Sequence, residues 1–273
     1  MEFESQGFRC KRTISEPSDM ASSAPVVEFS KVSLVLANGK PILQELSFDV
    51  QRGEILILLG RSGSGKTTAL KLINRLLELS NGQLRVEGCA TTDWNPIKLR
   101  RHIGYAIQEV GLFPHYTVAR NIALVPCIQN WPREKSEARV GELLRLVGLD
   151  AEIASRYPQQ LSGGQRQRVG VARALAADPP ILLMDEPFGA LDPLTRADLQ
   201  REFLSLQQQL GKTVLFVTHD LHEALRLGTR IALLEEGKLI SLTSTDGFLR
   251  SSEPLVKKYV EAFGTSTGQG ERP

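Results

Sequence analysis

The stretch ILILLGRSGSGKTTALKLINRLLEL, residues 55–79, decides the fold. Its first five residues, Ile55–Leu59, are all apolar, which is typical of a strand covered on both faces of a sheet. The glycine-rich segment Gly60–Thr68 follows directly. Beyond it, apolar residues recur at helical spacing, at Leu70, Ile73, Leu76 and Leu77. The stretch therefore predicts a buried strand, a glycine-rich loop and a helix that continues through Leu77.

The glycine-rich segment, GRSGSGKTT, matches the P-loop pattern G-x-x-x-x-G-K-[ST] and has the flanking strand and helix that this motif requires. In a P-loop, backbone N–H groups and a helix N-terminus surround a phosphate, and glycines permit the close approach. We expect Lys66 to reach the β- and γ-phosphates of a bound nucleotide and the Thr67 hydroxyl to ligate Mg²⁺. The alternative, a glycine-rich turn with an exposed lysine, does not explain the strand and helix. The residues assigned to the nucleotide are Gly60, Arg61, Ser62, Gly63, Ser64, Gly65, Lys66, Thr67 and Thr68.

The segment ILLMDEP, residues 181–187, supplies the acidic groups that such a site needs. Four apolar residues lead to Asp185, at the edge of the sheet where ligands bind in open α/β folds. We expect Asp185 to hold Mg²⁺ through water and Glu186 to act as the general base on the attacking water. The alternative is that both carboxylates cap the following segment, and the P-loop in the same chain argues against it.

Three more polar residues follow predicted strands: Gln108 after IGYAI, Asp192 in FGALDP and His219 after VLFVT. A single histidine at a strand end is more often structural than functional. These strands alternate with helices, as does the strand before the P-loop. We therefore expect all three residues at the edge of the sheet that carries the P-loop. Gln108 would orient the attacking water or Mg²⁺, and His219 would contact the γ-phosphate. No role is assigned to the three other histidines, His102, His115 and His222.

The composition excludes some classes of function. The chain has 273 residues, with 33 basic and 31 acidic side chains and a net charge of +2. This balance gives no electrostatic reason to expect a nucleic acid partner. No apolar run approaches the roughly 18 residues that span a bilayer, so work at a membrane would need a partner with spanning helices.

Patterns along the chain predict its organisation. Residues 26–54 alternate apolar and polar side chains around turn signals at Asn38–Gly39 and Gln51–Gly53, which predicts antiparallel strands. Residues from about 109 to 177 show helical patterns and no clear strand. The predicted fold class is α/β, a P-loop NTPase core with an antiparallel β subdomain and an inserted α-helical subdomain. The expected divisions are a disordered N-terminal extension at 1–24, one ATPase domain at 26–264 and a flexible tail at 265–273.

A second glycine pair lies in LSGGQ, residues 161–165. With the P-loop, Gln108, ILLMDEP, GALD and the strand-end His219, in this order and spacing, it makes residues 26–264 resemble the ATPase subunit of ATP-binding cassette (ABC) transporters. The resemblance implies ATP hydrolysis by two copies packed head to tail, with each ATP between the P-loop of one copy and LSGGQ of the other. It adds five residues to the nucleotide site: Ser162, Gly163, Gly164, Gln165 and Asp192.

The stretch from Gln108 to Ile122, QEVGLFPHYTVARNI, is similar to bacterial importers, especially those for osmoprotectants such as glycine betaine, choline or carnitine. This resemblance implies a homodimer partner, two transmembrane permease subunits and an extracytoplasmic substrate-binding protein. It also implies a peripheral location on the cytoplasmic face of the inner or plasma membrane. An importer subunit for another solute, such as an amino acid, is the main alternative.

Three rival classes fit the sequence less well. Among non-transport ABC ATPases, repair proteins insert long coiled coils, for which residues 66–161 have no sustained heptads, and ribosome-associated ones carry two cassettes per chain. An unrelated P-loop kinase or GTPase has no need of LSGGQ or GALD. An exporter cassette is disfavoured by the GLFPH segment, residues 111–115.

One position departs from the resemblance. ABC relatives usually have an aromatic residue near the end of the first strand that stacks on adenine, and Leu36 stands at that position here. Stacking of a base on an aromatic ring is worth about 1–3 kcal/mol in nucleic-acid binders. We therefore expect weaker nucleotide affinity, or weaker preference for adenine, than is usual for the family.

Overall fold

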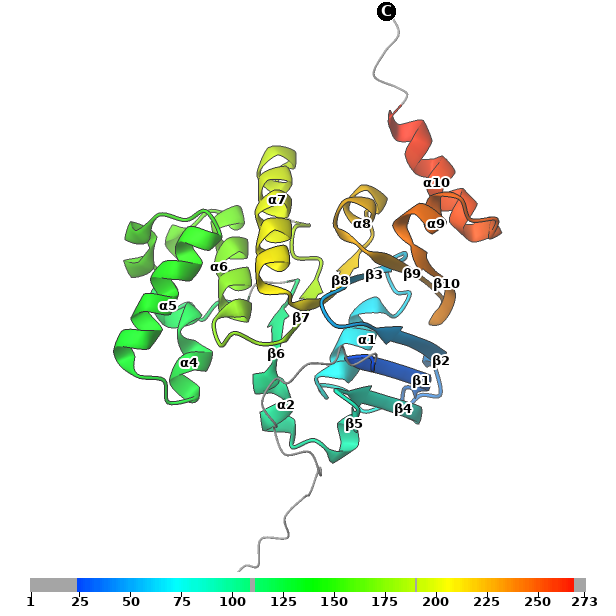
Figure 1. Ribbon diagram of the computed structural model, residues 1–273, viewed down its shortest axis with the longest axis horizontal. Helices are drawn as coiled ribbons and strands as arrows, with labels where there is room; N and C mark the ends of the chain where they lie inside the picture. The colour runs from blue at the N-terminus through cyan, green and yellow to red at the C-terminus, as the bar shows by residue number, and fades with distance from the viewer. Residues whose placement is uncertain (1–23, 109–110, 190, 268–273) are drawn as a thin grey trace, which may run out of the picture.

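The computed structural model describes residues 24–108, 111–189 and 191–267. Two sheets and the helices around them make up these residues (Figure 1). Residues 1–23 of the predicted N-terminal extension lie outside the described residues, as do residues 109–110 at the start of the predicted helical subdomain. Of the predicted flexible tail, residues 268–273 also lie outside, while residues 265–267 are the end of helix α10, Pro254–Thr267.

The larger sheet has six strands in the order β10-β9-β3-β8-β7-β6. Five strands are parallel to one another, and β10 (Lys238–Ser244) pairs antiparallel with β9. The parallel strands are β3 (Ile55–Leu59), β6 (Ile103–Ala106), β7 (Ile181–Asp185), β8 (Thr213–Thr218) and β9 (Arg230–Glu235). Every residue of β3, β7 and β8 is buried, as their apolar sequences predict. The carboxyl ends of these three neighbouring strands meet at one edge of the sheet.

The smaller sheet has four antiparallel strands in the order β2-β1-β4-β5. They are β1 (Val27–Val35), β2 (Pro41–Val50), β4 (Asn81–Val86) and β5 (Cys89–Ala90). The predicted turn at Asn38–Gly39 joins β1 to β2, and Gly39 takes a φ of +79° that favours glycine. Phe29 and Phe48 stack across this pair with ring centroids 4.3 Å apart.

Two hydrophobic cores cover the two faces of the six-stranded sheet. On one face, Leu56 and Leu58 of β3 join α1 (Lys66–Ile73) and the four-stranded sheet. On the other face, alternate residues of β3 join α6 (Gly163–Leu175), α7 (Pro193–Leu210) and α8 (Leu221–Leu227). The alternation follows from the two-residue period of a strand. The predicted α/β P-loop NTPase fold with an antiparallel β subdomain is confirmed.

Helix α1 is shorter than its apolar pattern predicts. The prediction that it runs through Leu77 is wrong, because α1 ends at Ile73, and Leu76 and Leu77 are exposed. Arg75 takes a left-handed φ of +52°, and the backbone N–H of Leu76 donates to the carbonyl of Lys71 at 2.8 Å, which closes the helix end. The Arg75 guanidinium also donates to the carbonyl of Trp94 at 2.9 Å, a long-range bond that fixes this turn.

Residues 111–177 contain helices and turns, and no strand among those that the structure describes. The helices are α3 (Val118–Ile122), α4 (Leu124–Ile128), α5 (Arg133–Leu146) and α6. In Figure 1, α4, α5 and α6 lie at the end of the molecule opposite to α10. The strand predicted to reach Gln108 ends at Ala106 as β6. Short helices α2 (Pro96–His102) and α9 (Thr245–Leu249) complete the fold.

No helix among the described residues is long and apolar enough to cross a membrane.

Candidate functional site

The P-loop residues connect β3 to α1 in a conformation that depends on glycine. Gly65 precedes α1 with a φ of +99°, and a Cβ there would lie 2.5 Å from Cδ2 of Leu43. The Lys66 ammonium folds back over the loop and donates to the carbonyls of Gly60 and Arg61, both at 2.8 Å. Ser64 Oγ is buried and has no hydrogen-bond partner among the described residues. The loop therefore holds a cation and a free hydroxyl where a phosphate would bind.

Thr67 and Asp185 form a pair of oxygen ligands beside this loop. The Thr67 hydroxyl donates to Oδ1 of Asp185 at 2.8 Å, and the Tyr105 hydroxyl donates to Oδ2 at 3.4 Å. Burial raises the pKa of Asp185, and the hydrogen bond from Thr67 opposes the shift. A hydroxyl and a carboxylate fit Mg²⁺, which binds one or two protein oxygens together with phosphate oxygens and water. The donor set therefore fits a metal that arrives with a nucleotide.

Burial lowers the pKa of Lys66, and the nearby carboxylates of Glu186 and Asp185 oppose the shift. A cation that is partly desolvated in this way interacts more strongly with an incoming phosphate than a cation in water does.

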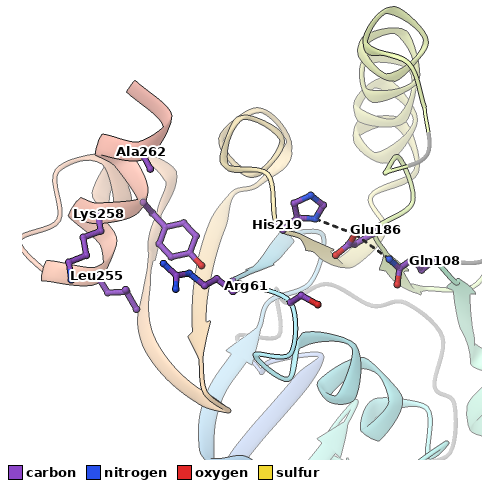
Figure 2. Close-up of a pocket in the computed structure, with 10 residues that line it drawn as sticks. Arg61, Gln108, Glu186, His219, Leu255, Lys258 and Ala262 are labelled. Carbon is purple, nitrogen blue, oxygen red and sulfur yellow. Dashed lines mark hydrogen bonds and ion pairs between the residues drawn. The ribbon is translucent and has the colours of Figure 1, made fainter. Parts of the chain in front are cut away.

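Glu186 lies between two polar side chains at the ends of neighbouring strands. Its Oε2 is 3.2 Å from Nδ1 of His219 and accepts a hydrogen bond from Nε2 of Gln108 at 3.4 Å. Figure 2 shows His219 and Gln108 on either side of the carboxylate. Glu186 has a left-handed φ of +45°, and its N–H donates to the carbonyl of Val217 on β8 at 3.0 Å. A non-glycine residue with this backbone is uncommon and is often found at functional sites.

A cavity of about 520 Å³ joins the P-loop to these side chains (Figure 2). Its lining includes Gly60, Arg61, Ser62, Gln108, Glu186 and His219. These segments are far apart in the sequence and meet because β3, β8 and β7 are neighbours in the sheet. The cavity therefore places a carboxylate, an amide and an imidazole opposite a phosphate-binding loop.

Helix α10 supplies a wall of this cavity that the sequence reasoning did not identify. Leu255, Lys258, Tyr259 and Ala262 line it. Burial raises the pKa of the Tyr259 phenol, and the positive charge of Arg61 opposes the shift. The apolar spacing of Leu255, Val256, Tyr259 and Val260 is the signal that predicts this helix.

LSGGQ begins helix α6 in a reciprocal cap. Oγ of Ser162 accepts from the Gln165 N–H at 3.1 Å, and Oε1 of Gln165 accepts from the Ser162 N–H at 3.0 Å. None of the described residues that line the P-loop cavity comes from LSGGQ. The start of α6 is therefore a helix N-terminus with partial positive charge, and the P-loop cavity of the same chain does not use it.

Asp192 caps helix α7 and lies close to LSGGQ. Its Oδ1 accepts from the Thr195 N–H at 3.0 Å, and this bond lowers the pKa of Asp192. A Cβ at Gly164 would lie 3.2 Å from Cδ2 of Leu191 and 3.8 Å from Cγ2 of Thr195. Two motifs assigned to the nucleotide thus pack together at the N-termini of α6 and α7, away from the lining of the cavity.

Leu36 lies in the turn after β1, where its N–H donates to the carbonyl of Lys40 at 2.9 Å. Its side chain is 44% exposed and is not among the residues that line the cavity.

The chain is similar in sequence to proteins of one known family. The family model described as ABC transporter matches residues 43–189. The glycine betaine/carnitine/choline transport ATP-binding protein OpuCA of Bacillus subtilis (strain 168) is 48% identical over 238 residues, which are 87% of this chain and 62% of that protein. The glycine betaine uptake system ATP-binding protein YehX of Escherichia coli (strain K12) is 51% identical over 215 residues, 79% of this chain and 70% of that protein.

A similar solved structure is the dimeric post-hydrolysis state of the ATP-binding cassette MJ0796 bound to ADP and Pi. The TM-score is 0.75 at 33% identity, covering 80% of this chain and 98% of that chain. This chain spans about three fifths of the length of OpuCA and of the choline transport protein OpuBA, 62% of each.

Proposed function

Since this chain belongs to the ABC transporter family, we propose that it is the ATP-hydrolysing subunit of an importer for quaternary-amine osmoprotectants. The observation that carries the assignment of ATP hydrolysis is the carboxylate of Glu186, held between Gln108 and His219 at the P-loop cavity. A base in that position faces the γ-phosphate of a nucleotide whose phosphates lie in the loop.

The P-loop binds the phosphates in this proposal. Backbone N–H groups of residues 60–68 and the free hydroxyl of Ser64 contact phosphate oxygens, and Lys66 neutralises their charge. Thr67 and Asp185 hold Mg²⁺, which when bound offsets negative charge on the phosphate oxygens. Because Asp185 is buried, few water molecules compete with the metal for its carboxylate oxygens.

Hydrolysis then depends on the residues around Glu186. Glu186 accepts a proton from water while the water oxygen bonds to the γ-phosphorus and the bond to the bridging oxygen of ADP breaks. Gln108 and His219, which contact the carboxylate, orient it and the water. His219 lines the same cavity as the P-loop residues Gly60 and Ser62, which is the position from which it contacts the terminal phosphate in this proposal.

LSGGQ and Asp192 act on the nucleotide of a second copy in this proposal. The α6 N-terminus is exposed to solvent and lies outside the lining of the P-loop cavity of the same chain. A phosphate bound there therefore belongs to a nucleotide that the P-loop of a second copy holds. A head-to-tail homodimer brings Ser162, Gly163, Gly164 and Gln165 to the γ-phosphate of the partner. The cassette at 33% identity, which is dimeric and bound to ADP and Pi, supports the dimer.

The transported solute is proposed from the relatives. Proteins named for transport or uptake of glycine betaine, carnitine or choline are 41–51% identical to this chain, among them OpuCA, OpuBA and YehX. The remaining partners are two permease subunits and an extracytoplasmic substrate-binding protein, which place the ATPase on the cytoplasmic face of the membrane. An importer for another solute, such as an amino acid, is the alternative.

The proposal is tested by reconstituting the chain with its permease and binding protein in liposomes and measuring ATP hydrolysis. Glycine betaine, choline or carnitine should stimulate hydrolysis, and amino acids should not. Stimulation by amino acids alone discards the quaternary-amine assignment, and hydrolysis that no permease alters discards the transport assignment.

A further inference from the structure

Helices α7 and α8 start directly after the two segments that carry Asp192 and His219, and polar side chains connect the N-terminal halves of the two helices. These side chains are Arg196 and Gln200 on α7, and Asp220 and Glu223 at the start of α8. We call these four residues the α7–α8 bridge. None of them has a part in the hydrolysis described above.

Arg196 contacts both segments with one guanidinium. Its Nη2 donates to the carbonyl of Leu191 at 3.2 Å and to that of Gly189 at 3.5 Å. Its Nη1 lies 3.7 Å from Oδ2 of Asp220, the residue that follows His219. Because a guanidinium is planar and rigid, a shift of the backbone before α7 also moves the Arg196 guanidinium that pairs with Asp220.

The position of Asp220 determines that of the preceding residue, His219. Its Oδ1 accepts from the N–H groups of His222 at 2.8 Å and Glu223 at 3.3 Å, which caps α8. Its own N–H donates to Oγ1 of Thr218 at 3.0 Å. Asp220 is thus bonded to Thr218 before it and to His222 and Glu223 after it. Because His219 lies between Thr218 and Asp220 in the chain, a shift of Asp220 also moves His219. The Nδ1 of His219 meets Glu186 at 3.2 Å.

A second, buried layer keeps the two helices in register. Nε2 of Gln200 donates to Oε1 of Glu223 at 3.0 Å, and Arg226 donates to Oε1 of Gln200 at 3.3 Å. Gln200 and Glu223 are 5% and 7% exposed. Buried polar groups that are bonded in this way hold one geometry, because breaking the pair leaves an unsatisfied group.

We infer that Arg196 is a positioning residue, through which Leu191 and Asp192, at the start of α7, set the place of His219 beside Glu186. The inference rests on the proposed function, in which these residues face a second copy. Contact with the partner then aligns the hydrolytic side chains, and ATP binding itself does not need the bridge. Arg196 is not among the described residues that line the P-loop cavity.

Three variants test this inference in the purified chain. Arg196→Met removes the guanidinium, Arg196→Lys keeps the charge, and Asp220→Asn keeps the Oδ1 cap but removes the charge. Arg201→Met is the matched control, because Arg201 lies on the same helix and pairs with Asp198 on its surface. The measurements are kcat, the Kd for ATP, the Tm and, in the Glu186→Gln background, the dimer fraction with ATP.

Arg196→Met should lower kcat about 10- to 100-fold, as expected for a misplaced hydrolytic group, while Kd and dimerisation stay within about twofold. Arg196→Lys should recover part of kcat. The double variant Arg196→Met/Asp220→Asn should be no slower than Arg196→Met, because both changes break one contact. Arg201→Met should match wild type.

A wild-type kcat in Arg196→Met overturns the inference. So does a loss of kcat in the double variant that equals the product of the losses in the two single variants. So does a loss of ATP binding and Tm in step with kcat, which indicates a structural role only. If Arg196→Met does not fold, Asp220→Asn and Arg196→Lys decide the question by the same split between kcat and Kd. Absence of hydrolysis in wild type and Arg201→Met would instead refute the proposed function, and the inference with it.

Discussion

Replacing Glu186 by glutamine is the sharpest test of the hydrolytic site. Both contacts of the carboxylate use Oε2, at 3.2 Å from His219 Nδ1 and 3.4 Å from Gln108 Nε2. A glutamine oxygen in that place accepts from the same nitrogens, so the geometry is kept and only basicity is lost. General base catalysis is worth about 10²–10⁴-fold, so we expect kcat to fall by that factor, or by about 3–5 kcal/mol of barrier.

The assay is steady-state phosphate release with saturating ATP, together with light scattering for mass. Glu186→Gln should bind ATP as wild type does and accumulate as an ATP-bound dimer, because the step that separates the copies is blocked. Glu137→Gln is the control, since Glu137 forms only a surface pair with Arg133 on α5. A variant that keeps more than a tenth of wild-type kcat refutes Glu186 as the base. A monomer at saturating ATP refutes the sandwich arrangement.

Lys66→Ala should lose both nucleotide binding and turnover, because it removes the ammonium that donates to the P-loop carbonyls of Gly60 and Arg61. Titration with a fluorescent nucleotide checks this, and retained turnover contradicts the P-loop assignment. Leu36→Tyr should tighten ATP binding by about 1–3 kcal/mol, roughly 5- to 150-fold in Kd, if the residue stacks on adenine, and an unchanged Kd contradicts that placement. Glu87→Gln should lower stability by less than about 1 kcal/mol near pH 6, because the His102 hydrogen bond holds the pKa of Glu87 below its usual value. A lowered folded-state pKa gives stability that is present above the unfolded value of 4.5 and is lost as pH falls through the folded value, so urea melts of wild type and variant should converge in acid.

The sheet could be predicted because its signals are local. Runs such as Ile181–Met184 and Val214–Val217 are apolar throughout, and each lies in a fully buried strand. The order of the strands then decides which loops meet. Gln108, Glu186 and His219 follow β6, β7 and β8, which are neighbours, so their side chains lie together at one edge.

The features that were missed depend on contacts between distant residues. The end of α1 is set by the bond of Arg75 to Trp94, and nothing in the apolar spacing through Leu77 records it. The place of α10 beside the P-loop is likewise invisible in a helix pattern, which predicts a helix but not its neighbour. The bridge of Arg196 to Asp220 joins residues 24 positions apart, and single charged residues on two predicted helices carry no signal of it.

The two glycine loops of this chain are connected within the molecule, although they act on different nucleotides in the proposed dimer. Gly164 of LSGGQ packs on Leu191 and Thr195 at the start of α7. Arg196 joins that start to Asp220, and His219 beside it meets Glu186 at the P-loop cavity. A γ-phosphate bound at LSGGQ of one copy therefore contacts elements that also position His219 beside Glu186, at the site of the other ATP. This continuity gives a physical reason for the two sites of the dimer to act in concert, since the start of α7 contacts LSGGQ on one side and, through Arg196, the segment that carries His219 on the other.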